Sequence, residues 1–422
     1  MIYSDKNHIN TFLIFLIVGL QVFSPVLFVP GGEAFGLSVF RLLVFSLGIF
    51  IYFKFGIVHN SDWEKTFLTV NTVLIIWLFF SIFWSENFSS GIKHVAYFST
   101  ILMLSYVFTY FVRFPNGFRT IALFISAIGL AIIFISFYEI NTGVHLFRSS
   151  LQDVSELDRS LSYVTENQAW FTFGNPNDLA VHIAVCCFVT LMFSKSKIYS
   201  IIYFAMSFYI VNALDSRIVV IALIAFLMFY LLFYYQKIPS LIVKTAFASL
   251  LVGGFAFLVI LSQASRVEFL DVSSFVRLQL ITSAVDMARQ SFLVGIGAGG
   301  FESEMWRGGY LARTIGITNP HNGFGRLLAE NGIIGLSLFL VMLLLPLLII
   351  RKARQDSGLI ASVASATIVM PLLFSVGSDP LSSSSLQLAM AFLLVSATFA
   401  AASDSLPPEM GVDDASVLPN PY

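Results

Sequence analysis

The sequence predicts an all-α integral membrane protein with about 12 transmembrane helices and a large extracytoplasmic loop between the ninth and tenth helices. Of its 422 residues, 57% are hydrophobic and 11% are charged, whereas a soluble domain carries roughly 25% charged residues. Long apolar runs without charge recur along the chain, each near the length of about 20 residues that crosses a bilayer. Lys and Arg are unevenly distributed between these runs. These observations exclude a soluble globular protein.

The apolar runs give twelve candidate membrane spans. The first reaches Phe28 without an Ala-x-Ala cleavage pattern and is followed by further spans, so we interpret it as a membrane helix and not as a removed signal peptide. In chain order the spans are 11–29, 36–56, 66–84, 94–112, 119–138, 179–194, 198–214, 217–235, 245–263, 333–350, 358–377 and 385–401.

The basic residues in the short connections predict the orientation, because cytoplasmic loops carry an excess of Lys and Arg. With the N-terminus in the cytoplasm, both termini are cytoplasmic and the short outer connections hold only Lys93 and Arg217. Twelve basic residues then lie on the inner side: Lys6, Lys54, Lys65, Arg113, Arg119, Lys195, Lys197, Lys237, Lys244, Arg351, Lys352 and Arg354.

Two outer connections, about 140–178 and 264–332, are too long for simple turns, and their aromatic and apolar content predicts that both are ordered. We therefore divide the chain into three parts. Residues 1–178 hold the first five spans and the first outer loop, and residues 179–401 hold the remaining spans with the outer loop 264–332. Residues 402–422 contain four prolines and are predicted to be a disordered cytoplasmic tail.

Composition narrows the possible functions. The net charge of -1 gives no reason to expect a nucleic-acid partner. The only cysteines, Cys186 and Cys187, are adjacent in an apolar run, so we interpret them as small core residues and expect no cysteine-based zinc site. The clear ionisable residues inside the spans are chiefly Arg41 and His182. Without an acidic residue near mid-membrane, the chemistry is expected at the outer face.

Arg277 lies on an apolar face if 275–290 forms a helix, since Ile281, Ala284 and Ala288 fall within about 40° of it at 100° per residue. A buried arginine needs an anionic partner. That partner is either a structural carboxylate or lipid headgroup, or a phosphate of a substrate. Sequence alone leaves both interpretations open.

Arg217 follows Asp215 and Ser216, either of which can cap the helix that continues into the next span. Free N–H groups and the positive helix end would then meet the arginine at the outer membrane surface, which makes an anion site. The alternative is that Arg217 pairs with Asp215 or with a lipid phosphate.

His321 belongs to the segment Thr318-Asn-Pro-His-Asn322, directly before a long span. Pro320 suits the first position of a helix capped by Asn319, which would place His321 in the first turn. That environment favours a neutral imidazole, as a general base requires. A lone histidine is more often structural than catalytic. The catalytic interpretation of His321 therefore depends on its position beside the two candidate phosphate ligands, Arg217 and Arg277.

Taken together, these segments resemble the bacterial O-antigen ligase and O-antigen polymerase superfamily of membrane glycosyltransferases. The resemblance covers most of the chain and is strongest from about 174 to 350. It rests on Gly174-Asn-Pro-Asn-Asp178, Asp215-Ser-Arg217, Arg277 followed by Gly295-Ile-Gly-Ala-Gly-Gly-Phe301, and Pro320-His-Asn322 through Glu330-Asn-Gly-Ile-Ile-Gly335. It implies a GT-C-like fold in the bacterial plasma (inner) membrane with an extracytoplasmic active site.

The resemblance also implies a metal-independent, inverting glycosyl transfer without cofactors. The donor would be a polyprenyl-diphosphate-linked glycan, with Arg217 and Arg277 on the diphosphate and His321 assisting the acceptor hydroxyl. The acceptor would be a lipid-linked repeat or lipid A core, and membrane lipids are the other partners. Further substrate contacts are expected from Arg41, Asn322, Asn175, Asn177 and Trp306. Each asparagine is equally explained as a cap or turn residue, and Trp306 is equally explained as an interfacial aromatic.

Several alternatives stay open. We favour polymerisation of O-antigen, exopolysaccharide or cell-wall polysaccharide repeats over an O-antigen ligase, because the long segment from Ile140 to Asp178 resembles polymerases of exopolysaccharide and cell-wall polymers more than core ligases. A peptidoglycan polymerase of the shape-and-division type would need an essential outer carboxylate, for which Glu302, Glu304 and Glu330 lack a matching motif. A lipid-linked glycan flippase would need a charged central cavity, which the sparse intramembrane charges do not supply.

Overall fold

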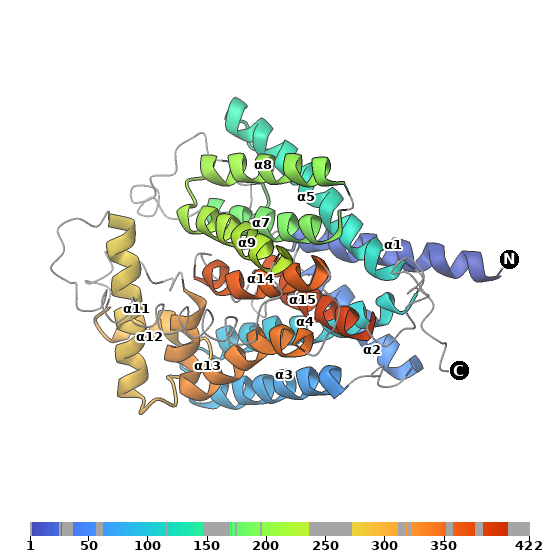
Figure 1. Ribbon diagram of the computed structural model, residues 1–422. Helices are drawn as coiled ribbons and strands as arrows, with labels where there is room; N and C mark the ends of the chain where they lie inside the picture. The colour runs from blue at the N-terminus through green and yellow to red at the C-terminus, as the bar shows by residue number, and fades with distance from the viewer. Residues whose placement is uncertain are drawn as a thin grey trace.

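The computed structural model shows a bundle of helices, most of which run roughly along one direction (Figure 1). It describes residues 2–24, 27, 37–55, 62–114, 116–146, 169, 171–173, 175–194, 196–235, 272–310, 318, 322–351, 358–375 and 383–403. Within these residues every regular element is a helix, which confirms the all-α class. Intramembrane backbone must satisfy its own hydrogen bonds, and a helix does so within one segment.

The helices are α1 (Ile2–Val22), α2 (Val39–Phe55), α3 (Asp62–Ser81), the 3-10 turn η2 (Ile82–Trp84), α4 (Phe88–Val112), α5 (Gly117–Thr142), α7 (Pro176–Phe193), α8 (Lys197–Ala213), α9 (Arg217–Tyr235), α11 (Val272–Gln290), α12 (Phe301–Arg307), α13 (Gly323–Ile350), α14 (Gly358–Phe374) and α15 (Ser384–Ser403). A helix therefore lies at eleven of the twelve predicted spans. The predicted span 245–263 and the tail 404–422 lie outside the described residues.

Five of the described helical segments are long and apolar enough to cross a membrane: Lys65–Trp84, Phe88–Val112, Gly117–Thr142, Pro176–Phe193 and Gly323–Ile350. Large apolar side chains are exposed on the outside of the bundle, where a soluble protein would carry polar groups. They include Phe53, Phe80, Phe83, Phe134, Ile198 and Ile201. This surface matches a bundle embedded in lipid.

Several predicted helix boundaries were wrong, and two of them have a clear physical reason. The first helix ends at Val22 and not near residue 29, because Ser24 and Pro25 follow and a proline cannot extend a helix. The tenth predicted span begins ten residues early, at Gly323. The prediction treated the charged residues Arg326 and Glu330 as loop, whereas the structure buries both inside the helix.

The segment 264–332, which the predicted topology assigns to the outer side, contains the separate helices α11 and α12 and the start of α13, so its described part is ordered as predicted. Figure 1 shows α11 crossing one end of the bundle, opposite the N-terminus, with α12 beside it. The buried face of α11 packs against α12 and the first part of α13 in a small apolar cluster that includes Leu280, Ala284, Phe301 and Ala329. This cluster is separate from the main core of the bundle.

Candidate functional site

Polar side chains join several helix ends at one end of the bundle. Gln21 in the last turn of α1 donates to the hydroxyl of Ser384 at the start of α15 (3.1 Å). His182 of α7 lies 2.8 Å from the hydroxyl of Ser385. All four side chains are buried. His182 therefore belongs to the packing between α7 and α15.

Arg217 begins α9, so Ser216 directly precedes the helix as predicted. The Ser216 hydroxyl donates to the side-chain oxygen of Asn177 in the first turn of α7 (2.8 Å). This bond brings together two of the sequence segments on which the family resemblance depends. The Arg217 side chain is 73% exposed, and its Nε lies 3.5 Å from an Asp215 carboxylate oxygen that is itself largely exposed. An exposed ion pair of this kind contributes at most about 1 kcal/mol.

Asn175 and Asn322 are helix caps. The side-chain oxygen of Asn175 accepts the N–H of Asn177 at the start of α7, and that of Asn322 accepts the N–H of Gly325 at the start of α13 (both 2.8 Å). Capping therefore uses the oxygen of each side chain, and only the amide nitrogen can donate to a substrate.

The predicted start of α13 was wrong, because its cap is Asn322 and not Asn319. Asn322 has extended backbone angles and reaches the N–H three residues ahead, which is the geometry that capping needs. His321 itself lies outside the described residues. In the sequence it directly precedes the cap.

Arg41 lies near the start of α2 and is buried, with its guanidinium 4.5 Å from the centre of the Tyr97 ring on α4. A cation over an aromatic face is a favourable contact. One turn earlier on α4, His94 approaches the same ring. Arg41 is thus held at the contact between α2 and α4, close to His94.

Arg277 lies on α11 and is partly buried. The fully buried face of α11 runs through Val276, Leu280, Ala284 and Met287, so Arg277 stands at the edge of that face and not in its middle as predicted. Trp306 on α12 is exposed. Among the predicted residues, Asn177 contacts the Ser216 that precedes Arg217, whereas Arg277 and Trp306 lie on the two separate outer helices.

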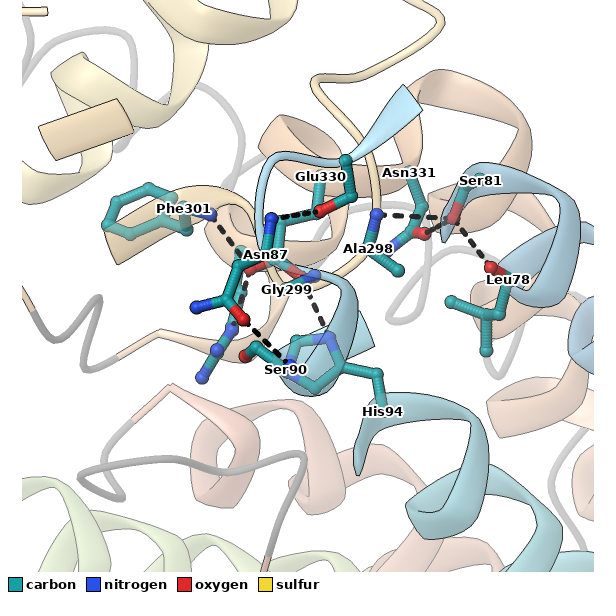
Figure 2. Close-up of polar contacts among 12 residues, drawn as sticks. Leu78, Ser81, Asn87, Ser90, His94, Ala298, Gly299, Phe301, Glu330 and Asn331 are labelled. Atoms are coloured by element: carbon teal, nitrogen blue, oxygen red, sulfur yellow. Dashed lines mark hydrogen bonds and ion pairs between the residues drawn. The ribbon is translucent and has the colours of Figure 1, made fainter. Parts of the chain in front are cut away.

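A buried carboxylate, Glu330, organises the site in a way that sequence reasoning missed. Figure 2 shows it on α13, facing the glycine-rich turn and His94. Its Oε2 accepts the N–H of Gly299 (3.0 Å), and its Oε1 accepts the N–H of Phe301 (3.2 Å). The His94 Nδ1 lies 2.8 Å from Oε2, and the Arg326 Nε donates to Oε1 (3.1 Å).

A second buried carboxylate, Glu139 at the end of α5, holds the first outer segment. Its two oxygens accept the N–H groups of Leu146 and Phe171, each at 3.0 Å. Phe171 lies four residues before the cap of α7. Glu139 therefore fixes the approach of the chain to the Asn-Pro-Asn segment.

Glu330, Arg326, His94 and the N–H groups of Gly299 and Phe301 form a cluster, called the Glu330 cluster below. One signal in the sequence points to it. Arg326 and Glu330 are four residues apart, the spacing of an ion pair on one helix face, directly before a long apolar run. His94, the other partner, begins a predicted span but is 236 positions away, so no local pattern connects them. Among the described residues, no group of three or more His, Cys, Asp or Glu side chains is arranged to hold a metal ion.

Gly332 is the tightest point of this region, because it interrupts α13 with φ 65° and ψ -164°. Only glycine adopts this conformation readily, and a Cβ here would overlap the carbonyl oxygen of Leu293. We expect Gly332→Ala to destabilise the protein by at least about 3 kcal/mol, measured as a loss of thermal stability in detergent. Gly19→Ala is the control, since nothing lies within 4 Å of its added Cβ. Equal stability of the two variants would contradict the described kink.

Part of the chain is similar to a known protein family. Residues 202–340 match the family model described as O-antigen ligase. The matched stretch ends within α13, at residue 340. It contains Arg217, Arg277, Trp306, His321 and Asn322. Arg41, Asn175 and Asn177 lie outside it. No curated protein matches the chain.

Proposed function

We propose that the chain belongs to the O-antigen ligase and polymerase superfamily of membrane glycosyltransferases, and that it transfers a polyprenyl-diphosphate-linked oligosaccharide onto an acceptor glycan at the outer face of the bacterial plasma membrane. The match of residues 202–340 to the O-antigen ligase family model supports this proposal. The observation that carries this proposal is the position of Arg217. It is exposed at the first residue of a helix, inside the matched stretch, and beside the Asn-Pro-Asn segment.

The arrangement of helix ends supports the proposed orientation. Contacts join the last turns of α1 and α5 to residues at or before the first turns of α15 and α7. Glu330, in the N-terminal part of α13, joins His94 in the second turn of α4 to the turn before α12. The distribution of Lys and Arg predicts that these same helix ends lie on the outer side of the membrane, if the chain has twelve spans and a cytoplasmic N-terminus. Outer helices α11 and α12 stand at the end opposite the N-terminus (Figure 1).

In the proposed reaction, Arg217 and Arg277 hold the donor diphosphate. A guanidinium group binds phosphate oxygens through two parallel N–H bonds, and two such groups offset the charge that grows on the leaving diphosphate. Arg41 is a further candidate ligand, although its present position over Tyr97 is buried. This chemistry needs neither a nucleotide nor a metal ion.

His321 acts as the base. It takes the proton of an acceptor hydroxyl as the oxygen attacks the anomeric carbon from the side opposite the diphosphate. The bond between that carbon and the diphosphate oxygen breaks, and polyprenyl diphosphate leaves. The anomeric configuration is therefore inverted. The amide nitrogens of Asn175, Asn177 and Asn322 and the exposed ring of Trp306 are candidate contacts to sugar hydroxyls and a sugar face.

The acceptor decides between two activities. The long first outer segment, held at both described ends by Glu139, favours a second lipid-linked repeat and hence polymerisation. The description of the matching family model favours the alternative, a ligase that transfers the glycan to lipid A core.

A reconstituted assay tests the proposal. Purified protein in liposomes is given polyprenyl-diphosphate oligosaccharide in a chelating buffer without nucleotide, with or without lipid A core. A ladder of longer lipid-linked glycans supports the polymerase, and a product formed only with lipid A core supports the ligase. Movement of the donor across the liposome membrane without any glycosidic product would overturn the proposal in favour of a flippase.

A further inference from the structure

We propose that Glu330 is a positioning residue, which fixes the glycine-rich turn 295–301 to α13 and so determines where α11 presents Arg277. The inference rests on the proposed function, because it assigns a role in the site of that reaction. Glu330 cannot itself contact a substrate in this structure, since its side chain is fully buried.

Four backbone N–H groups of the turn donate hydrogen bonds to α13. Two bonds go to the Glu330 carboxylate, from Gly299 and Phe301. Two more go to the α13 backbone, where Ile296 donates to the Ala329 carbonyl and Gly297 donates to the Glu330 carbonyl (both 2.9 Å). Gly297 and Gly299 have positive φ. An added Cβ at Gly297 would meet Ser85, before α4, and one at Gly299 would meet Ser90 and Gly91 in the first turn of α4. The turn is therefore held on both sides.

The carboxylate charge is essential to this attachment. Glu330 faces two backbone donors, the Arg326 guanidinium and the His94 imidazole. A carboxylate presents only acceptors, whereas a glutamine would turn an NH₂ group toward one of these donors. A buried donor left without an acceptor is costly. Glu330→Gln is thus expected to release one side of the turn while the size of the side chain stays the same.

Release of the turn would move Arg277 more than it moves the turn itself. The turn is continuous with the C-terminal end of α11, where the Leu293 carbonyl accepts the N–H of Ile333 and the Gly295 carbonyl accepts the Trp84 indole N–H. Arg277 lies 13 residues before Gln290, or about 20 Å along the helix axis. A tilt of about 3° at the turn then displaces Arg277 by about 1 Å, enough to reduce catalysis on the order of 100-fold.

Two measurements on full-length protein test this role. The first is the transfer assay, in which Glu330→Gln should lower kcat/KM for the donor on the order of 100-fold. The second is the distance between spin labels at Gln279→Cys on α11 and Phe88→Cys on α4. Glu330→Gln should shift or broaden this distance distribution by about 1 Å, the displacement that the tilt produces near this end of α11. The native cysteines stay in place, because both are buried.

Glu304→Gln is the matched control, since it neutralises a neighbouring carboxylate on α12 and should leave both measurements unchanged. If Glu330→Gln does not fold, Glu330→Asp replaces it. Aspartate keeps the charge but has a shorter side chain, so it should shift the distance between the labels by less than the value expected for Glu330→Gln. A variant that loses transfer with an unchanged distance distribution would overturn the positioning role. The label distance does not depend on activity, so failure of the proposed reaction and failure of this inference are distinguishable.

Discussion

Replacement of His321 by alanine should lower the rate of glycan transfer by about 10²- to 10⁴-fold, the usual contribution of a positioned general base. The acceptor hydroxyl is a poor nucleophile until its proton is removed, and alanine offers no group to accept that proton. Donor binding should change little, because the proposed mechanism assigns the diphosphate to the arginines and not to the histidine. The loss is therefore expected in kcat, with KM for the donor nearly constant.

The reconstituted assay measures this effect, with binding of the donor followed separately. His59→Ala is the control, because His59 lies in a connection that the topology places in the cytoplasm. It should retain wild-type transfer. Full activity of His321→Ala would refute the assignment of the base and leave the reaction with another proton acceptor.

The sequence predicted the membrane helices well because their cause is local. A run of about 20 apolar residues without charge must form a helix in lipid, and a helix lies at every predicted span that the structure describes. The cap at Asn175 follows the same logic, since Asn-Pro is a strong local start signal. The start of α13 was harder to predict, because Asn319 and Asn322 are both residues that can cap a helix. Only the path of the chain selects between them.

The cluster around Glu330 depends on contacts between distant parts of the chain. Glu330 and Arg326 are visible as a helical pair, but His94 and the N–H groups of Gly299 and Phe301 come from other elements. For α11, a helical wheel identifies apolar positions but not which of them a neighbour covers. The neighbours Phe301 and Ala329 select Leu280 and Ala284, which leaves Arg277 at the edge.

The second large effect is expected at the two arginines. Arg217→Ala and Arg277→Ala should each reduce transfer by about 10²- to 10³-fold, comparable to the loss of one donor from an anion-stabilising site. Lysine at either position should restore only part of the activity. It keeps the charge but cannot form two parallel hydrogen bonds to phosphate.

Two controls separate this role from a structural one. Arg289→Lys changes an exposed arginine on the same helix as Arg277 and should have no effect. Asp215→Asn removes the charged partner of Arg217, while asparagine tolerates the left-handed backbone at this position. If Arg217 only pairs with Asp215, Asp215→Asn should impair the protein as much as Arg217→Lys does.

A double-mutant cycle asks whether both arginines act on one diphosphate. Residues on separate helices that share no ligand should show additive effects on log(kcat/KM), whereas residues that share a ligand are coupled. We therefore expect Arg217→Ala combined with Arg277→Ala to lose less than the product of the two single effects. An additive cycle would contradict the shared diphosphate and would assign the two arginines to different groups, such as donor phosphate for one and a membrane headgroup for the other.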